Sequence, residues 1–180
     1  PSSSSSTIDR YVVYNYAQNI WYYGTLVRTA WVDRGIQDYP VAAGLDGYLY
    51  YHENGFDDGS TSPASAVSSY IESSQFDIGD GNNFSFVSKL IPDITFRNSS
   101  ASTPSVTFTM KARNFPGGNY LQTDDEAVTK TASVPVEQFT NQNFVRLRGR
   151  SMALRIESSE TGMSWRLGSP RIDVRQDGRR

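Results

Sequence analysis

Phe144-Val145-Arg146-Leu147-Arg148-Gly149-Arg150 begins a stretch, ending at residue 175, in which apolar and charged residues alternate. The alternation resumes in residues 152–157, 165–167 and 171–175, with turn-forming residues between these segments. A period of two residues is typical of a strand that buries only one of its faces. We therefore expect an antiparallel meander whose core face consists of Val145, Leu147, Met152, Leu154, Ile156, Trp165, Leu167, Ile172 and Val174.

The opposite face of this expected meander is rich in arginine, and Glu157 and Asp173 are the acids in the same segments. A planar guanidinium binds phosphate or carboxylate with defined geometry, which points to a partner subunit or to nucleic acid. Ordinary cross-strand ion pairing and solubility form the alternative interpretation. The candidate site residues, for a subunit interface or a DNA path, are Arg146, Arg148, Arg150, Arg155 and Arg166.

The composition of the 180-residue chain favours an all-β protein, because it contains eleven Tyr and nine Phe and shows no convincing helical repeat. Cysteine is absent, which excludes disulfides and thiolate metal sites. No apolar run approaches the length of a membrane span, so we expect no membrane partner. The expected order is an antiparallel, propeller-like blade followed by a β-rich platform that is sandwich-like and ends in the meander.

The turn and linker signals predict where these parts begin and end. Hairpin turns at residues 17–19 and 44–47 would join four strands into one blade. A segment rich in turn-forming residues would separate the blade from the platform. The predicted parts are a flexible lead-in at 1–9, the blade at 10–56, a linker at 57–64, the platform at 65–176 and an exposed tail at 177–180.

Charge is unevenly distributed along the chain, whose net charge is −2. Residues 1–90 carry four basic and ten acidic side chains, whereas residues 91–180 carry thirteen basic and nine acidic ones. A net charge near zero does not suit a tight nucleic-acid binder. We therefore slightly favour contacts between the arginines and carboxylates from the first half of a neighbouring subunit over contacts with DNA.

Catalytic and metal-binding patterns are weak. His52 is the single histidine and lies in an aromatic strand, where a hydrogen-bonded structural role is the usual one; no Gly-x-Ser-x-Gly elbow is present. Asp77 and Asp80 lie in a glycine-rich turn, but a calcium loop would need a glutamate in register, so a plain turn is favoured. We expect no enzyme activity, no cofactor and no bound metal.

Eight segments of the chain share one resemblance: residues 13–16, 19–26, 47–55, 70–73, 76–81, 91–93, 165–175 and 177–180. Together they resemble the tail hub, or nozzle, proteins of short-tailed bacteriophages, also called packaged-DNA stabilisation proteins. The family implies a β-propeller attached to a β-rich platform, arranged as a ring below the portal through which DNA leaves. The resemblance covers most of this chain, as the C-terminal portion of a longer member, and rests on structural motifs.

This resemblance implies a structural virion protein that forms part of the channel retaining and ejecting packaged DNA. Its partners would be other copies of itself in a ring, portal or adaptor and other tail proteins, and double-stranded DNA in transient, sequence-independent contact. It would reside in the virion tail, and in the host cytoplasm during assembly. The alternatives are a carbohydrate-binding β-sandwich, which needs exposed aromatics on one sheet face, and a polysaccharide-degrading enzyme, which needs two converging carboxylates.

Overall fold

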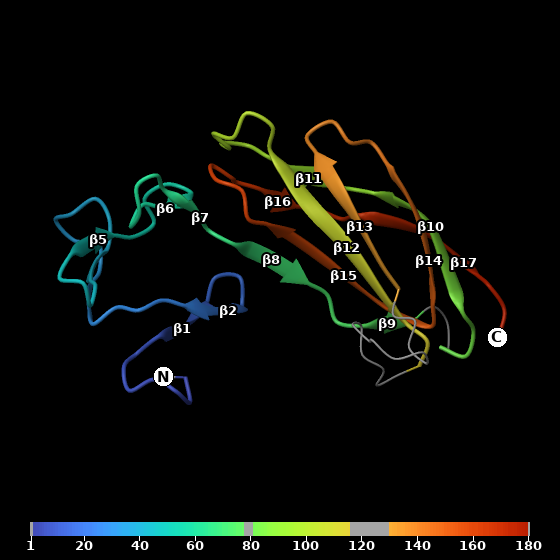
Figure 1. Cartoon of the computed structure of the whole chain (residues 1–180), viewed down its shortest axis with the longest axis horizontal. Helices are drawn as coiled ribbons and strands as arrows, with labels where there is room; N and C mark the ends of the chain where they lie inside the picture. The colour runs from blue at the N-terminus through green and yellow to red at the C-terminus, as the bar shows by residue number, and fades with distance from the viewer. Residues whose placement is uncertain (1, 78–80, 116–129, 180) are drawn as a thin grey trace. The chain divides into compact units, whose positions relative to one another are not determined.

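A computed structural model describes residues 2–77, 81–115 and 130–179 (Figure 1). Within these ranges all regular structure is β: seventeen strands are present and no helix. The all-β prediction is confirmed. None of the described residues forms a helix of the length and apolarity needed to cross a membrane. The chain divides into two compact units, Pro1–Gly55 and Phe56–Arg180.

The first unit contains two separate small sheets. β1 (Arg10–Asn15) pairs with β2 (Ile20–Thr25), and β3 (Ala30–Val32), β4 (Val41–Ala43) and β5 (Leu49–Tyr51) form a second sheet in that order. Both predicted hairpins are therefore present. The predicted four-stranded blade at 10–56 is wrong, because its strands are divided between two sheets, β1–β2 and β3–β4–β5.

The second unit is a β-sandwich. One sheet has the order β14 (Asn143–Gly149), β10 (Ser85–Ile91) and β17 (Arg171–Gln176). The other has the order β13 (Lys130–Glu137), β12 (Ser105–Arg113), β15 (Ser151–Ser158) and β8 (Ser69–Glu72), with β9 (Phe76–Asp77) also on β15. Val87, Leu90 and Leu147 from the first sheet share one buried cluster with Phe108, Met110 and Ile156 from the second, so the two sheets pack face to face.

The predicted antiparallel meander of residues 144–175 is wrong in its strand partners. β14 pairs with β10, whereas the next strand, β15, pairs with β12 and β8 in the opposite sheet. The chain changes sheets at Gly149, where an added Cβ would lie 2.7 Å from Ala112 Cβ. Arg150 N donates to Arg113 O (2.8 Å) just beyond this corner. Glycine permits the close approach that this change of sheet requires.

The predicted core face of the same residues is correct. Val145, Leu147, Met152, Leu154 and Ile156 are buried, and the half-buried Trp165, Leu167, Ile172 and Val174 pack against them. The Trp165 indole also donates a hydrogen bond to Ser69 Oγ (3.0 Å). Alternation therefore specified which side of each strand faces inward, although it did not specify the neighbouring strand.

The predicted linker at 57–64 and tail at 177–180 both take part in the fold of the second unit. β6 (Asp57–Asp58) pairs with β7 (Ser65–Ala66), and Asp57 Oδ1 accepts a hydrogen bond from Gly162 N (2.7 Å). Asp177 N donates to Phe84 O (2.8 Å), which extends the pairing of β17 with β10. In the predicted lead-in, Ser2 Oγ donates to Asp9 Oδ2 (2.6 Å) and folds the chain back on itself.

Candidate functional site

The five candidate arginines do not share one face. Arg146 and Arg148 lie on β14, and Arg155 lies on β15 in the opposite sheet. Arg166 belongs to β16 (Arg166–Leu167), which pairs with β11 (Ile94–Thr95) in a separate ladder. Arg150 lies at the corner between β14 and β15, where its Nη2 donates to Arg179 O (3.0 Å). The expected common face is wrong because the expected meander is wrong.

Arginines and phenylalanines instead gather on the outer face of the sheet β14–β10–β17. Phe86 on β10 lies directly opposite Arg148 on β14 and Arg175 on β17, and the Arg175 guanidinium lies 4.8 Å from the centre of its ring. The Arg148 guanidinium lies 4.1 Å from the ring centre of Phe84. We call this surface the arginine face: Arg146, Arg148, Arg171, Arg175, Lys89, Phe86, Phe144 and Ile91.

The arginine face is cationic overall. It has five basic side chains and two neighbouring acids, Asp173 on β17 and Asp177 just after that strand. Arg148 Nε lies 2.6 Å from Asp177 Oδ2, and Asp173 Oδ2 accepts a hydrogen bond from Ser88 Oγ (2.8 Å). The net charge of the surface is therefore +3. Arg146 and Arg171 are exposed and form no ion pair with any residue in the described ranges.

Arg155 forms ion pairs with acidic side chains of its own chain. Its guanidinium lies 2.7 Å from Glu157 Oε2 and 3.0 Å from Glu72 Oε2, and it covers the Tyr70 ring at 4.0 Å. Lys111 Nζ lies 2.7 Å from Glu72 Oε1. The hydrogen bond from Lys111, joined by one from Arg155, lowers the pKa of Glu72 below its ordinary value. This ion-pair network ties β8, β12 and β15 together.

The most exposed apolar surface of the described chain lies in the first unit, and the sequence interpretation missed it. Ala42 is the one buried hydrophobic residue described there. Tyr16, Trp21 and Tyr23 expose 86%, 67% and 77% of their surface, respectively. The signal in the sequence was a lack of alternation: residues 10–23 are apolar or aromatic on both sides of each strand.

The β1–β2 hairpin, residues 10–25, presents two different apolar faces. Directly opposed residues share a face, so Val12 with Tyr23 and Tyr14 with Trp21 lie on one side and Val13 with Tyr22 on the other. Tyr14 and Trp21 stack with ring centres 4.5 Å apart. We call the first side the aromatic face of the hairpin: Val12, Tyr14, Trp21 and Tyr23.

His52 lies just after β5 and has a structural partner. Arg28 Nε donates a hydrogen bond to His52 Nε2 (3.1 Å), and the Trp31 ring lies 4.6 Å from the imidazole. Burial, together with the neighbouring Arg28 charge, lowers the pKa of His52. An imidazole whose ring nitrogen accepts from a guanidinium has that nitrogen occupied, which does not suit a general base.

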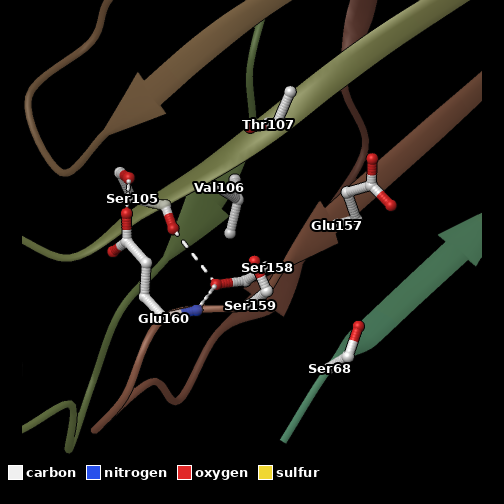
Figure 2. Close-up of a pocket in the computed structure, with 8 residues that line it drawn as sticks. All are labelled: Ser68, Ser105, Val106, Thr107, Glu157, Ser158, Ser159 and Glu160. Atoms are coloured by element: carbon white, nitrogen blue, oxygen red, sulfur yellow. Dashed lines mark hydrogen bonds between the residues drawn. The ribbon is translucent and has the colours of Figure 1, made fainter. Parts of the chain in front are cut away.

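A polar pocket of about 300 Å³ lies in the second unit at the end of β15 (Figure 2). Its lining includes Glu157 and Glu160, which Figure 2 shows on opposite sides of the pocket. Ser105 Oγ donates to Glu160 Oε1 (2.8 Å), and Arg155 Nε donates to Glu157 Oε2 (2.8 Å). Each of these two carboxylates therefore has a hydrogen-bond partner within the chain.

Metal ligands do not gather anywhere in the described part of the chain: no group of three histidine, cysteine or acidic side chains could hold an ion. Asp77 belongs to β9, and Asp80 lies outside the described residues.

Comparison with known proteins identifies no relative. No protein-family model matches the chain, and a search of curated proteins finds no match.

Proposed function

We propose that this chain is a structural subunit of a bacteriophage tail, a hub or nozzle component that assembles into a ring. In this role it forms part of the channel that retains and ejects packaged DNA, next to portal or adaptor and other tail proteins. It would reside in the virion tail, and in the host cytoplasm during assembly. The proposal starts from the resemblance of segments such as 13–16 and 165–175, and the all-β fold agrees with it.

The observation that carries the assembly role is the uncovered hairpin. At about 200 Å² per aromatic side chain, the three rings of its aromatic face leave on the order of 380 Å² exposed. A typical monomer has its largest apolar patch in the range of roughly 300–600 Å². Since that area lies on a two-stranded ribbon of sixteen residues, exposure on this scale favours a partner protein over solvent.

The arginine face supplies the second part of the role. A surface of net charge +3 attracts phosphates without reading base sequence, and such binding falls steeply with salt because counterions are released. DNA must slide through a tail, so contact of this weak and sequence-independent kind suits a channel. The same guanidiniums also suit contact with a neighbouring subunit, and experiment separates the two roles.

Sedimentation velocity and negative-stain microscopy of the full chain over a range of concentrations test the assembly role. We expect oligomers that grow with concentration and close into rings. Trp21→Ser combined with Tyr23→Ser should abolish them, whereas Ile36→Ser, which removes a fully exposed apolar side chain outside the hairpin, should leave them intact. A chain that stays monomeric at every concentration would contradict the proposal.

Arg146→Glu combined with Arg171→Glu separates the two uses of the arginine face. Lost rings indicate a subunit interface, whereas intact rings with weaker, less salt-dependent DNA binding indicate the channel wall. Intact rings with unchanged DNA binding would mean that this face is merely solvated.

A carbohydrate-binding module is the second candidate function. The observation that favours it is the row of exposed rings on the aromatic face of the hairpin, because flat rings stack on sugar faces. A glycan array with the monomeric chain decides between the two candidates. Saturable binding that Tyr23→Ala removes would support the sugar-binding role, and a blank array together with ring formation would support the assembly role.

A further inference from the structure

We propose that the aromatic face of the hairpin in one copy docks on the arginine face of a second copy. This inference rests on the proposed function as an assembling subunit and names the two surfaces that meet. The occupant of the arginine face is therefore the β1–β2 hairpin of another copy of this chain, residues 10–25.

The hairpin has a physical need for such a partner. A two-stranded ribbon is marginally stable in water unless one of its faces is covered. β1 and β2 pair only with each other among the described strands. The stacked Tyr14 and Trp21 rings stiffen the aromatic face, and the Tyr14 hydroxyl donates to Asn19 Oδ1 (2.8 Å) at the turn. A rigid aromatic ribbon loses little side-chain entropy on binding.

The arginine face has the chemistry to receive aromatic rings. Guanidiniums stack on Tyr and Trp faces through cation–π contacts, worth about 0.5–2 kcal/mol each as water is excluded. The chain already makes such contacts on this sheet, with Arg175 over Phe86 and Arg148 over Phe84. Arg146 and Arg171 are exposed here, and Phe144 adds an apolar ring with 75% of its surface exposed.

Charge and area agree with this pairing. The first unit as a whole carries three basic and five acidic side chains, so its net charge of −2 is opposite in sign to the +3 of the arginine face, although the hairpin itself contains only one charged residue, Arg10. About 380 Å² of aromatic surface is roughly half of the 800 Å² per partner of a standard interface, and Val12 with the polar rim adds to it. The opposite net charges of the first unit and the arginine face also speed their encounter.

The two surfaces are different parts of one chain, so the contact is heterologous. A heterologous contact leaves one free surface of each kind on every dimer, and it continues until a ring closes or a filament forms. Docking between these surfaces would therefore generate the ring that the proposed function requires, without any second type of contact.

Cysteine cross-linking tests the contact, because the chain has no cysteine of its own. Tyr23→Cys and Phe144→Cys proteins are purified separately, mixed and oxidised mildly. We expect a disulfide-linked dimer in the mixture and at least tenfold less in either protein alone. Ile36→Cys mixed with Phe144→Cys is the matched control, because Ile36 is more exposed than Tyr23 but lies outside the hairpin.

The outcomes separate this inference from the function on which it rests. Oligomers by sedimentation without the Tyr23–Phe144 cross-link would overturn the docking proposal and leave the assembly function standing. A cross-link in the Tyr23→Cys protein alone, as strong as in the mixture, would show a hairpin-to-hairpin contact and also overturn it. A chain that is monomeric at every concentration would overturn both.

Discussion

Both units of this chain contain large apolar side chains, and the units differ in how many of these side chains are buried. In the second unit two sheets enclose Phe108, Leu90 and Met110, which expose 1% of their surface or less. In the first unit each small sheet is a single layer, and Ala42 is its one buried hydrophobic residue among those described. A core requires a second layer, and the second unit supplies one from its own chain. Among its described residues, the first unit leaves most of its large apolar side chains exposed.

The largest expected difference between the units is the response to removal of an aromatic ring. Phe108→Ala should lower the free energy of unfolding of the second unit by about 3–5 kcal/mol, because it leaves a cavity in the sandwich core. Trp21→Ala should change the stability of the dilute chain by less than about 0.5 kcal/mol, since Trp21 is largely exposed. Urea unfolding followed by circular dichroism measures both values. Similar losses for the two variants would show that the dilute chain already covers the hairpin.

Glycine substitutions compare the two units through backbone spacing. An alanine at Gly149 would place its Cβ 2.7 Å from Ala112 Cβ and 3.0 Å from Arg113 O, and neither atom can move away easily. We expect Gly149→Ala to cost about 1–3 kcal/mol in thermal or urea unfolding. The Cβ of Gly24→Ala would instead meet the side-chain ring of Tyr11, at 2.5 Å from its hydroxyl. That ring can swing into solvent, so the loss in the first unit should be smaller, and a larger one would contradict the open hairpin.

The sequence predicted which side of each strand faces the core more reliably than it predicted which strands pair with each other. Val106, Phe108 and Met110 alternate in the sequence and are all buried, as a period of two requires. The position of β10 between β14 and β17 could not be predicted, because alternation carries no information about which distant strand lies alongside. The two hairpins of the first unit followed from local turn residues, but their failure to join depends on β3, whose three residues carry little pattern.

The candidate site divides in the same way. The arginines were correctly placed on outward faces, as the exposed Arg146 and Arg166 show. The sequence could not predict that Arg155 meets Glu72, 83 residues away, or that Arg171 and Arg175 join Arg146 on one sheet. Both facts depend on strand order, which is set by packing of the whole sandwich rather than by any one segment.

A smaller effect is expected from the ion-pair network of the second unit. Glu72→Gln removes a carboxylate that lies 2.7 Å from Lys111 Nζ and 3.0 Å from an Arg155 nitrogen. These side chains are 21–28% exposed, so solvent screening limits the loss to about 1 kcal/mol. Chemical denaturation at low and high salt measures it. The difference between wild type and Glu72→Gln should shrink at high salt, and a difference that does not depend on salt would assign the effect to packing instead.

The smallest expected effect is a difference between the two units in how their stability depends on pH. The pKa of His52 is lowered from its ordinary value of 6.5 by burial and by Arg28, so the unfolded first unit binds a proton more readily than the folded one. Its stability contribution is fully present above pH 6.5 and is lost as the pH falls through the lowered folded pKa. In the second unit the pKa of Glu72 is lowered from 4.5, so that contribution is lost only as the pH falls below 4.5.

Acidification should therefore loosen the first unit before the second. Protonated His52 can no longer accept from Arg28 Nε, and it repels the Arg28 guanidinium, while Glu53 partly offsets this repulsion. Amide hydrogen exchange between pH 7 and pH 5, corrected for intrinsic rates, should show lost protection at His52, whose N–H donates to Pro40 O (2.8 Å). Amides of β12, in the middle of its sheet, should keep their protection over that range. His52→Gln should remove the pH step from the first unit alone, and an unchanged step in that variant would assign the response to another group.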